Sequence, residues 1–263
     1  MDGITKTHGP LTVRQFPCLS DNYGFLVRDG ASGEVAAVDT PDAEAIAAQA
    51  DALGWKVTRV LNTHWHPDHT GGNEALAQRY GCEVIAPRAE ADRVPGHTRL
   101  IGPGDEVALG GTRARVLDVG GHTTGHVAYW FEAAGLAFVG DALFSLGCGR
   151  LFEGSPEQMW ASLSRLRALP PETTLYCAHE YTKANAAFAV TVDPGNEALA
   201  ARKAEVERLR EAGEPTVPML LSDELPVNPF LRADEPALAA SVSLAGAVLA
   251  GVYAESGRHK DAF

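Results

Sequence analysis

Short apolar runs, each closed by a polar or turn segment, recur through the first two thirds of the chain. Several are too continuously apolar for one of their faces to lie in water, which is typical of strands in a sheet that is covered on both sides. We therefore expect a covered sheet in this part of the chain. The predicted strands are residues 34–40, 57–63, 82–87, 113–119, 126–131, 135–141 and 173–179.

Helical periodicity lies between some of these strands. The clearest helix is residues 156–169, because Ser155 can cap it and Pro156 suits its first position. Two further helices are predicted at 42–53 and 73–80, and Gly81 would end the second. Strands that alternate with helices indicate an α/β domain.

The pattern changes after His179, where strands disappear and helices dominate. Helices are predicted at 182–190, 196–212 and 236–254, with a Pro-rich connector before the last of them. We therefore predict two domains, an α/β domain over residues 1–179 and an all-helical domain over residues 180–263.

The balance of charges limits the classes of partner. With 22 Lys and Arg against 34 Asp and Glu, the net charge is −12, which repels nucleic acid and anionic membrane surfaces. We expect a small-molecule substrate and a monomer that binds neither nucleic acid nor membrane. An anionic substrate would need a local cationic pocket.

The cellular compartment is suggested by the cysteines and by the start of the chain. The four cysteines are scattered, and the first residues show no secretory pattern. No stretch approaches the roughly 18 apolar residues of a membrane span. We therefore expect a protein of the reducing cytoplasm.

The segment THWHPDHT, residues 63–70, concentrates side chains that bind metals. His64, His66, Asp68 and His69 follow a predicted strand and precede a predicted helix, so we expect them on a loop. If the chain is extended at His64 and His66, both imidazoles point to the same side. A catalytic metal needs about three protein ligands and an open position, and this segment alone offers four.

Further ligand-type residues follow later predicted strands, namely His122, Asp141 and His179. Seven ligands imply two metals, which would share a carboxylate and hold between them a hydroxide that is a nucleophile at neutral pH. Imidazole and carboxylate ligands suit zinc, iron or manganese, and we expect two divalent ions, with zinc first among these. A purely structural metal site would instead close its coordination with four ligands.

The motif HxHxDH, followed by single His, Asp and His residues, resembles the metallo-β-lactamase superfamily. That resemblance implies an αββα sandwich with a two-metal site at one edge of its sheets. The glyoxalase II family within it is similar to this chain almost from end to end. The matching segments are DNYGFLV (21–27), THWHPDHTGGN (63–73), GHTTGH (121–126), GDALFSLGCGRLFEG (140–154), PPETTLYCAHEYTKAN (170–185), DPGN (193–196), GEPTVP (213–218), NPFLR (228–232) and KDAF (260–263).

The resemblance implies a role for each ligand. His64, His66 and His122 would bind one metal, Asp68, His69 and His179 the second, and Asp141 would bridge both. Asp68 and Asp141 would also orient the attacking hydroxide, which makes them catalytic.

The resemblance also implies a site for glutathione. Its residues would be Arg150, Phe152, Tyr181, Asn185, Arg258 and Lys260. The chain departs from the family at two of these positions. Phe152 replaces a Tyr and so lacks a hydroxyl donor, and Gly257 stands where the family has its C-terminal Arg, so Arg258 is displaced by one residue.

The implied reaction is hydrolysis of S-D-lactoylglutathione, or another S-2-hydroxyacylglutathione, to the 2-hydroxy acid and glutathione. This thioester hydrolysis belongs to methylglyoxal detoxification. Three alternative functions occur in the same superfamily. The first is a glutathione-persulfide dioxygenase, which needs one iron. The second is a nucleic-acid hydrolase, which the net charge disfavours, and the third is a β-lactamase. Several zinc β-lactamases have Cys at the position of Asp141.

Overall fold

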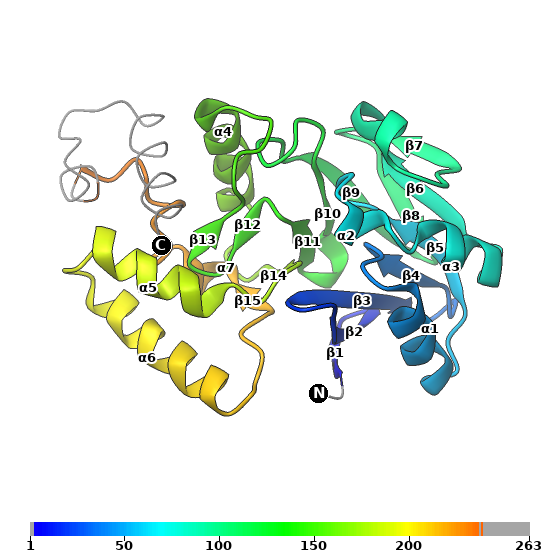
Figure 1. The fold of residues 1–263 in the computed structure, drawn as a ribbon, viewed down its shortest axis with the longest axis horizontal. Helices are drawn as coiled ribbons and strands as arrows, with labels where there is room; N and C mark the ends of the chain where they lie inside the picture. Colours follow the sequence, from blue (N-terminus) through cyan, green and yellow to red (C-terminus); the bar gives the residue numbers. More distant parts are fainter. Residues whose placement is uncertain (1–2, 237, 239–263) are drawn as a thin grey trace. The chain divides into compact units, whose positions relative to one another are not determined.

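The computed structural model describes residues 3–236 and residue 238. The chain forms two compact units, which we describe separately. Figure 1 labels the helices and strands of both. The first comprises Met1–Asp118 and Gly125–Gly140, and the second Val119–Thr124 and Asp141–Phe263. The predicted helix 236–254 lies almost wholly outside the described residues, and Gly257, Arg258 and Lys260 lie outside them entirely.

A seven-stranded sheet in strand order β1 to β7 forms one layer of the first unit. Strands β1 to β4 pair antiparallel, and β4 to β7 pair parallel. The predicted strands 34–40, 57–63 and 82–87 are confirmed as β4, β5 and β6, whereas β1, β2, β3 and β7 were not predicted. The bounds are β1 Ile4–His8, β2 Leu11–Cys18, β3 Asn22–Asp29, β4 Val35–Val38, β5 Val57–Leu61, β6 Glu83–Pro87 and β7 Arg99–Ile101.

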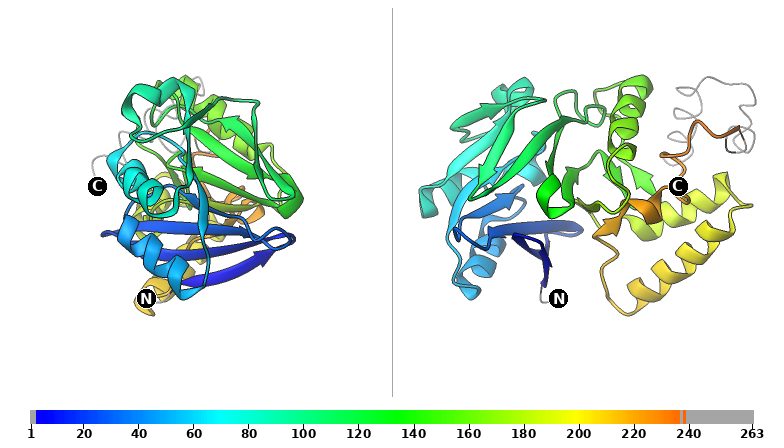
Figure 2. Two further views of the ribbon diagram at one scale, coloured as in Figure 1. Left: turned by 90° about the vertical axis from the view of Figure 1, so that its right-hand side faces the viewer. Right: turned by 180° about the vertical axis from the view of Figure 1, so that it is seen from behind.

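Two helices cover one face of this sheet (Figure 2). Helix α1, Ala43–Ala52, begins after Asp42, whose carboxylate accepts two backbone N–H groups, and its Ile46 is buried against the sheet. Helix α3, Asn73–Tyr80, ends at Gly81, whose φ of 66° is favourable only without a Cβ. Both helices were predicted from sequence.

A second, antiparallel sheet of the first unit contains β8 Glu106–Leu109, β9 Thr112–Asp118, β10 Val127–Phe131 and β11 Leu136–Gly140. The last three confirm the predicted strands 113–119, 126–131 and 135–141. The rings of Phe25 on β3 and Phe138 on β11 lie 5.4 Å apart. The two sheets therefore pack face to face around an apolar core.

The second unit is mainly helical. Helix α4, Pro156–Arg167, begins as predicted, with Ser155 Oγ accepting the N–H of Gln158. Helices α5, Thr182–Val192, and α6, Glu197–Glu211, confirm the predicted helices 182–190 and 196–212. They pack together around Leu199, Val206 and neighbouring apolar side chains. The remaining elements are β12 Leu143–Phe144, β13 Gly147–Cys148, β14 Thr174–Cys177, β15 Met219–Leu220 and α7 Leu221–Glu224.

One expectation for this region was wrong in detail, because a strand occurs after His179. Strand β15 pairs antiparallel with β14, whose predicted range was 173–179. Its two residues lie in the segment expected to be a connector, and so short a strand leaves no periodic pattern. Among the described residues, we find no helix with the length and apolar composition that crossing a membrane requires.

Candidate metal centre and active site

The ligand-type residues of the first unit follow β5, at the carboxyl end of a buried strand. His64 and His66 lie in the segment after the strand, as expected. Asp68 and His69 lie on a one-turn helix, α2 Pro67–Thr70, and not on the loop that was expected. Pro67 occupies the first position of this helix, where its missing N–H is not needed.

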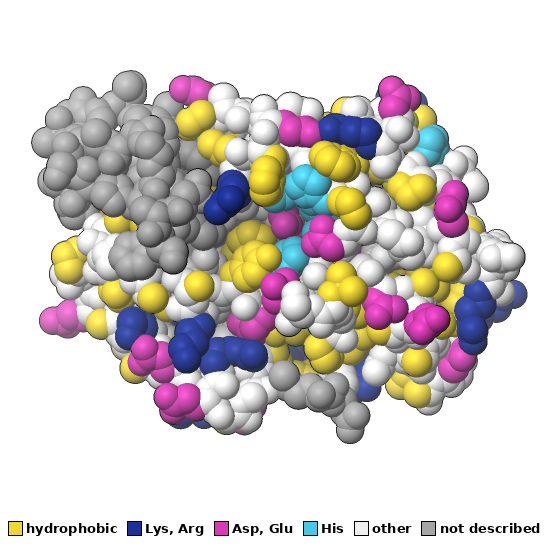
Figure 3. Space-filling model, in the orientation of Figure 1, with side chains coloured by type: hydrophobic (Ala, Val, Ile, Leu, Met, Phe, Trp, Pro, Cys, Tyr) yellow, Lys and Arg dark blue, Asp and Glu magenta, His cyan; other side chains and the backbone are white. Residues whose placement is uncertain are grey.

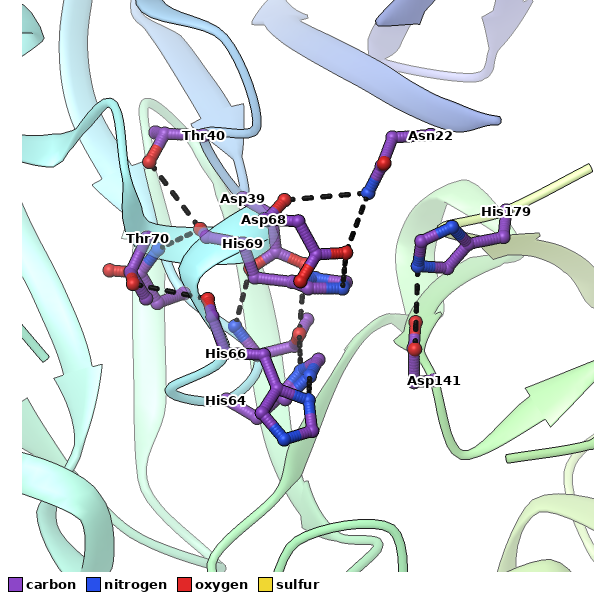
Figure 4. A network of polar contacts seen from close by, with 12 residues as sticks. Asn22, Asp39, Thr40, His64, His66, Asp68, His69, Thr70, Asp141 and His179 are labelled. Atoms are coloured by element: carbon purple, nitrogen blue, oxygen red, sulfur yellow. Dashed lines mark hydrogen bonds and ion pairs between the residues drawn. The ribbon is translucent and has the colours of Figure 1, made fainter. Parts of the chain in front are cut away.

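The side chains of this segment converge (Figure 4). His64 Nε2 lies 3.0 Å from His66 Nδ1, which bears out the expectation that the two imidazoles share a side. His69 Nε2 lies 3.5 Å from Asp68 Oδ2. His64 and His69 are buried, and such a gathering of imidazole and carboxylate groups could hold a metal ion.

Asp39 fixes the orientation of His69. Its Oδ2 lies 2.8 Å from His69 Nδ1, and both side chains are buried. A carboxylate only accepts, so His69 Nδ1 carries the proton and Nε2, which faces Asp68, presents a lone pair. A carboxylate behind a histidine is the usual arrangement around a metal-binding imidazole.

Thr63 extends this arrangement to His64. Its hydroxyl donates to Asp39 Oδ2 at 2.8 Å and lies 3.0 Å from His64 Nδ1. Since the hydroxyl has a single hydrogen, it must accept from His64 Nδ1–H. His64 Nε2 therefore presents its lone pair towards His66.

Three residues that support this group were not predicted from sequence. Asp39 has φ 55°, a left-handed conformation that a residue with Cβ adopts only where its surroundings impose it. Asn22 Nδ2 donates to Asp68 Oδ2 at 3.0 Å. His126 stacks on His64, with ring centroids 4.5 Å apart. For Asp39, the available signal was a carboxylate directly after a buried strand.

The second unit contains the other three predicted ligands. Asp141 Oδ2 lies 3.5 Å from His122 Nε2 and 3.4 Å from His179 Nε2. Figure 4 shows the pair Asp141 and His179. All three side chains are buried, and this group too could take part in binding a metal ion.

The orientation of His122 is fixed by the backbone. Its Nδ1 lies 2.8 Å from the carbonyl oxygen of Arg150. A carbonyl only accepts, so Nδ1 is protonated and Nε2 directs its lone pair towards Asp141. A glycine is required at position 149, because a Cβ there would lie 1.9 Å from the Asp141 carbonyl oxygen and 3.1 Å from His122 Nδ1.

Of the residues expected to bind glutathione, Arg150, Phe152 and Tyr181 lie beside predicted ligands of the second unit. Arg150 lies over the ring of Phe152, with 6.0 Å from its Cζ to the centroid, and Phe152 is 61% exposed. Tyr181 stacks on His179, with centroids 4.7 Å apart and an interplanar angle of 5°. Asn185 is buried, and its amide donates to Ser145 O at 3.0 Å.

Basic side chains also gather over helices α5 and α6 (Figure 3). Three basic residues of α6 form ion pairs with carboxylates of the same unit: Arg202 with Glu205, Lys203 with Glu207, and Arg210 with Glu180. These pairs neutralise the charge locally.

Comparisons with known proteins agree with this description. Residues 30–179 match the metallo-β-lactamase superfamily model, and residues 180–262 match the model of the hydroxyacylglutathione hydrolase C-terminus. The chain is 59% identical to a hydroxyacylglutathione hydrolase of Erythrobacter litoralis, over 88% of this chain and 91% of that protein.

Solved structures share the fold. A metallo-β-lactamase from Staphylococcus aureus matches with TM-score 0.64 and 20% identity, over 95% of this chain and 71% of its own. A protein designated TTHA1623, solved in a di-iron-bound form, matches with TM-score 0.54 and 26% identity, over 67% of this chain and 91% of its own. The predicted αββα sandwich with a helical C-terminal region is thereby confirmed. The chain belongs to the hydroxyacylglutathione hydrolase family of the metallo-β-lactamase superfamily.

Proposed function

We propose that the chain hydrolyses the thioester of S-D-lactoylglutathione and related S-2-hydroxyacylglutathiones, releasing the 2-hydroxy acid and glutathione. Sequence identity to a known hydrolase and the orientation of three imidazoles together support this proposal. The relative from Erythrobacter litoralis, a hydroxyacylglutathione hydrolase, is 59% identical. In addition, the imidazole lone pairs of His64, His69 and His122 are oriented by fixed hydrogen bonds, as metal ligands require.

The donor set fits two divalent ions. We propose that His64, His66 and His122 hold one ion, that Asp68, His69 and His179 hold the second, and that Asp141 is shared between them. Zinc suits these ligands, and iron is the alternative that the di-iron form of TTHA1623 supports. When bound, the ions would supply a hydroxide nucleophile at neutral pH and polarise the thioester carbonyl.

The chain's own residues orient the reaction. The carboxylates of Asp68 and Asp141 can accept a hydrogen bond from the attacking hydroxide and so direct its lone pair at the carbonyl carbon. Asn22 holds Asp68 in place for this task. The leaving group is a thiolate, whose conjugate thiol has a pKa of about 8.5, so a dedicated protonating residue is not required.

The peptide part of the substrate carries two carboxylates and one ammonium group, and it needs basic partners in a chain of net charge −12. We propose Arg150 as one partner, since it is exposed and its own carbonyl contacts the ligand His122. Phe152, Tyr181 and Asn185 belong to the same proposed site. Lys260 and Arg258, outside the described residues, would complete it.

We also propose that the chain acts as a monomer in the cytoplasm, with domains at 1–179 and 180–263. The ranges of the two family matches support this boundary. All proposed metal ligands come from one chain, and the buried thiols of Cys18, Cys82 and Cys177 suit a reducing compartment. Light scattering and cell fractionation test the first two statements, and separate expression of the two domains tests the third.

The decisive experiment measures release of free thiol from S-D-lactoylglutathione, with elemental analysis of the same protein sample. We expect turnover and two metal ions per chain. His66→Ala and Asp141→Ala should abolish turnover, whereas His97→Ala, a histidine outside the ligand set, should retain it. An inactive wild type with full metal occupancy would overturn the proposal. Oxygen consumption with glutathione persulfide would then identify a dioxygenase.

A further inference from the structure

A small buried hairpin lies between Asp141 and Arg150. It consists of β12, the turn Ser145–Leu146 and β13, with Leu143 paired to Cys148 and Phe144 to Gly147. We call it the 143–148 hairpin. Leu146 has φ 58°, a left-handed conformation that is unfavourable for a residue with a branched side chain. A two-residue ladder with such a turn needs support from outside itself.

That support comes from Glu224, at the end of α7, almost 80 residues later in the chain. Its Oε1 accepts the Ser145 hydroxyl at 2.5 Å, and its Oε2 accepts the Leu146 backbone N–H at 2.7 Å. Glu224 and the residues of the turn are buried, so water does not compete for these bonds. One carboxylate thus fixes both residues of the turn.

Asn228 and Asn185 complete the support. Asn228 Nδ2 donates to the carbonyls of Phe144 and Gly147, at 3.0 and 3.2 Å, and to Glu224 at 3.1 Å. Asn185 Nδ2 donates to Ser145 O. Each residue from Phe144 to Gly147 is therefore hydrogen-bonded to a side chain from beyond residue 180.

Movement of the hairpin would displace residues of the proposed site that precede it and residues that follow it. Asp141 and Ala142 precede it, and the Gly149 N–H donates back to Ala142 O at 3.4 Å. Arg150 follows, and its carbonyl fixes His122. On the hairpin itself, the Phe144 ring lies 5.3 Å from Tyr181.

We propose that Glu224 is a positioning residue for the hydrolase reaction, because it holds the 143–148 hairpin and thereby places Asp141 on one side and Arg150 on the other. The effect of Glu224 on catalysis depends on the proposed function, whereas its support of the hairpin does not. The Glu224 side chain contacts Ser145, Leu146 and Asn228, and it acts on the proposed site through the hairpin.

Two substitutions separate the hydrogen-bonding role of Glu224 from its volume. Glu224→Gln keeps the acceptor of the turn, because its carbonyl oxygen can accept from Leu146 and Asn228, while its amide donates to Ser145 Oγ where the carboxylate accepted from it. Glu224→Leu has similar volume and leaves the turn without its acceptor. Asp29→Leu is the matched control, since Asp29 is an equally buried carboxylate of the first unit that accepts from Ser32 and Thr112.

Two measurements on the metal-loaded full chain test the proposal. Hydrogen exchange of residues 143–150 should speed up in Glu224→Leu, and should match the wild type in Glu224→Gln and Asp29→Leu. For S-D-lactoylglutathione, Glu224→Leu should lose about 100-fold in kcat/KM, partly through a higher KM. Asp29→Leu should leave KM unchanged, because loss of folded protein lowers only the apparent kcat.

Unchanged exchange of residues 143–150 in Glu224→Leu would overturn the proposal. So would a Glu224→Leu variant whose KM equals that of the wild type. If Glu224→Leu does not fold, Ser145→Ala removes one contact only and should raise exchange at the turn with a smaller increase in KM. An inactive wild type would overturn the proposed function, while the exchange measurement would still decide whether Glu224 holds the hairpin.

Discussion

The carboxylate of Asp39 accepts a hydrogen bond from His69 Nδ1–H, with 2.8 Å between Oδ2 and Nδ1, so that the opposite ring nitrogen faces Asp68. In Asp39→Asn, either orientation of the amide sets its N–H groups against a donor. In one orientation they face His69 Nδ1–H and the Thr63 hydroxyl, and in the other they face the Thr63 backbone N–H. The first orientation would drive the proton of His69 to Nε2, which would then lose its lone pair. Asn also tolerates the left-handed backbone at this position.

We therefore expect Asp39→Asn to lower metal affinity by about 10- to 100-fold. Competition with a chromophoric chelator measures this affinity. The control is Asp42→Asn, three residues away, because Asn caps α1 as well as Asp does. Equal metal affinities in the two variants would contradict the role assigned to Asp39.

Asn22 offers a test of the orientation of Asp68. Asn22→Ala removes a buried amide that donates to Asp68 Oδ2 at 3.0 Å. A hydrogen bond to a charged group contributes about 1.5–3 kcal/mol, so we expect kcat/KM to fall by at least about tenfold. Thioester turnover measures this, and Ser20→Ala, in the turn just before β3, should leave turnover intact.

Phe152 offers a gain-of-function test. Its ring is 61% exposed, so the hydroxyl added in Phe152→Tyr has room. A new hydrogen bond of about 0.5–1.5 kcal/mol to glutathione should lower KM by about two- to tenfold, with kcat unchanged. Steady-state kinetics check this, and an unaltered KM would remove Phe152 from the proposed glutathione site.

Glu224 makes stability depend on pH. Burial raises the pKa of its carboxyl above the ordinary value of 4.5. Because the folded-state pKa is raised, the contribution of this carboxyl to the free energy of unfolding is complete below pH 4.5. That contribution is lost as pH rises through the folded-state pKa. Glu224→Gln cannot ionise, so its free energy of unfolding relative to wild type should increase from pH 4.5 upwards. Urea denaturation at several pH values measures this, and a constant difference would contradict it.

The sequence alone predicted those elements whose starts and ends are determined by neighbouring residues. Ser155 and Pro156 define the start of α4 within a single turn, and Gly81 ends α3 through its own backbone conformation. The strands of residues 11–29 were missed because Arg14, Pro17 and Arg28 interrupt their apolar pattern. Their structure depends on pairing with one another and with β4.

The same distinction applies to the site. His64, His66, Asp68 and His69 could be predicted because they are crowded into six positions. The partner of Asp39 could not be predicted, because Asp39 lies 30 residues from His69 and meets it only through the parallel pairing of β4 with β5. Glu224 is farther still from the turn that it supports, and no pattern of spacing predicts a contact of that kind.

The single hydrogen of the Thr63 hydroxyl has an evolutionary consequence. Because that hydrogen is committed to Asp39, one shared carboxylate sets which nitrogens of His64 and His69 are available as the proposed metal ligands. Loss of the hydroxyl would release one imidazole, and loss of the carboxylate would release both. We therefore expect positions 39, 63, 64 and 69 to be inherited together among relatives, with substitutions at any one of them compensated at another.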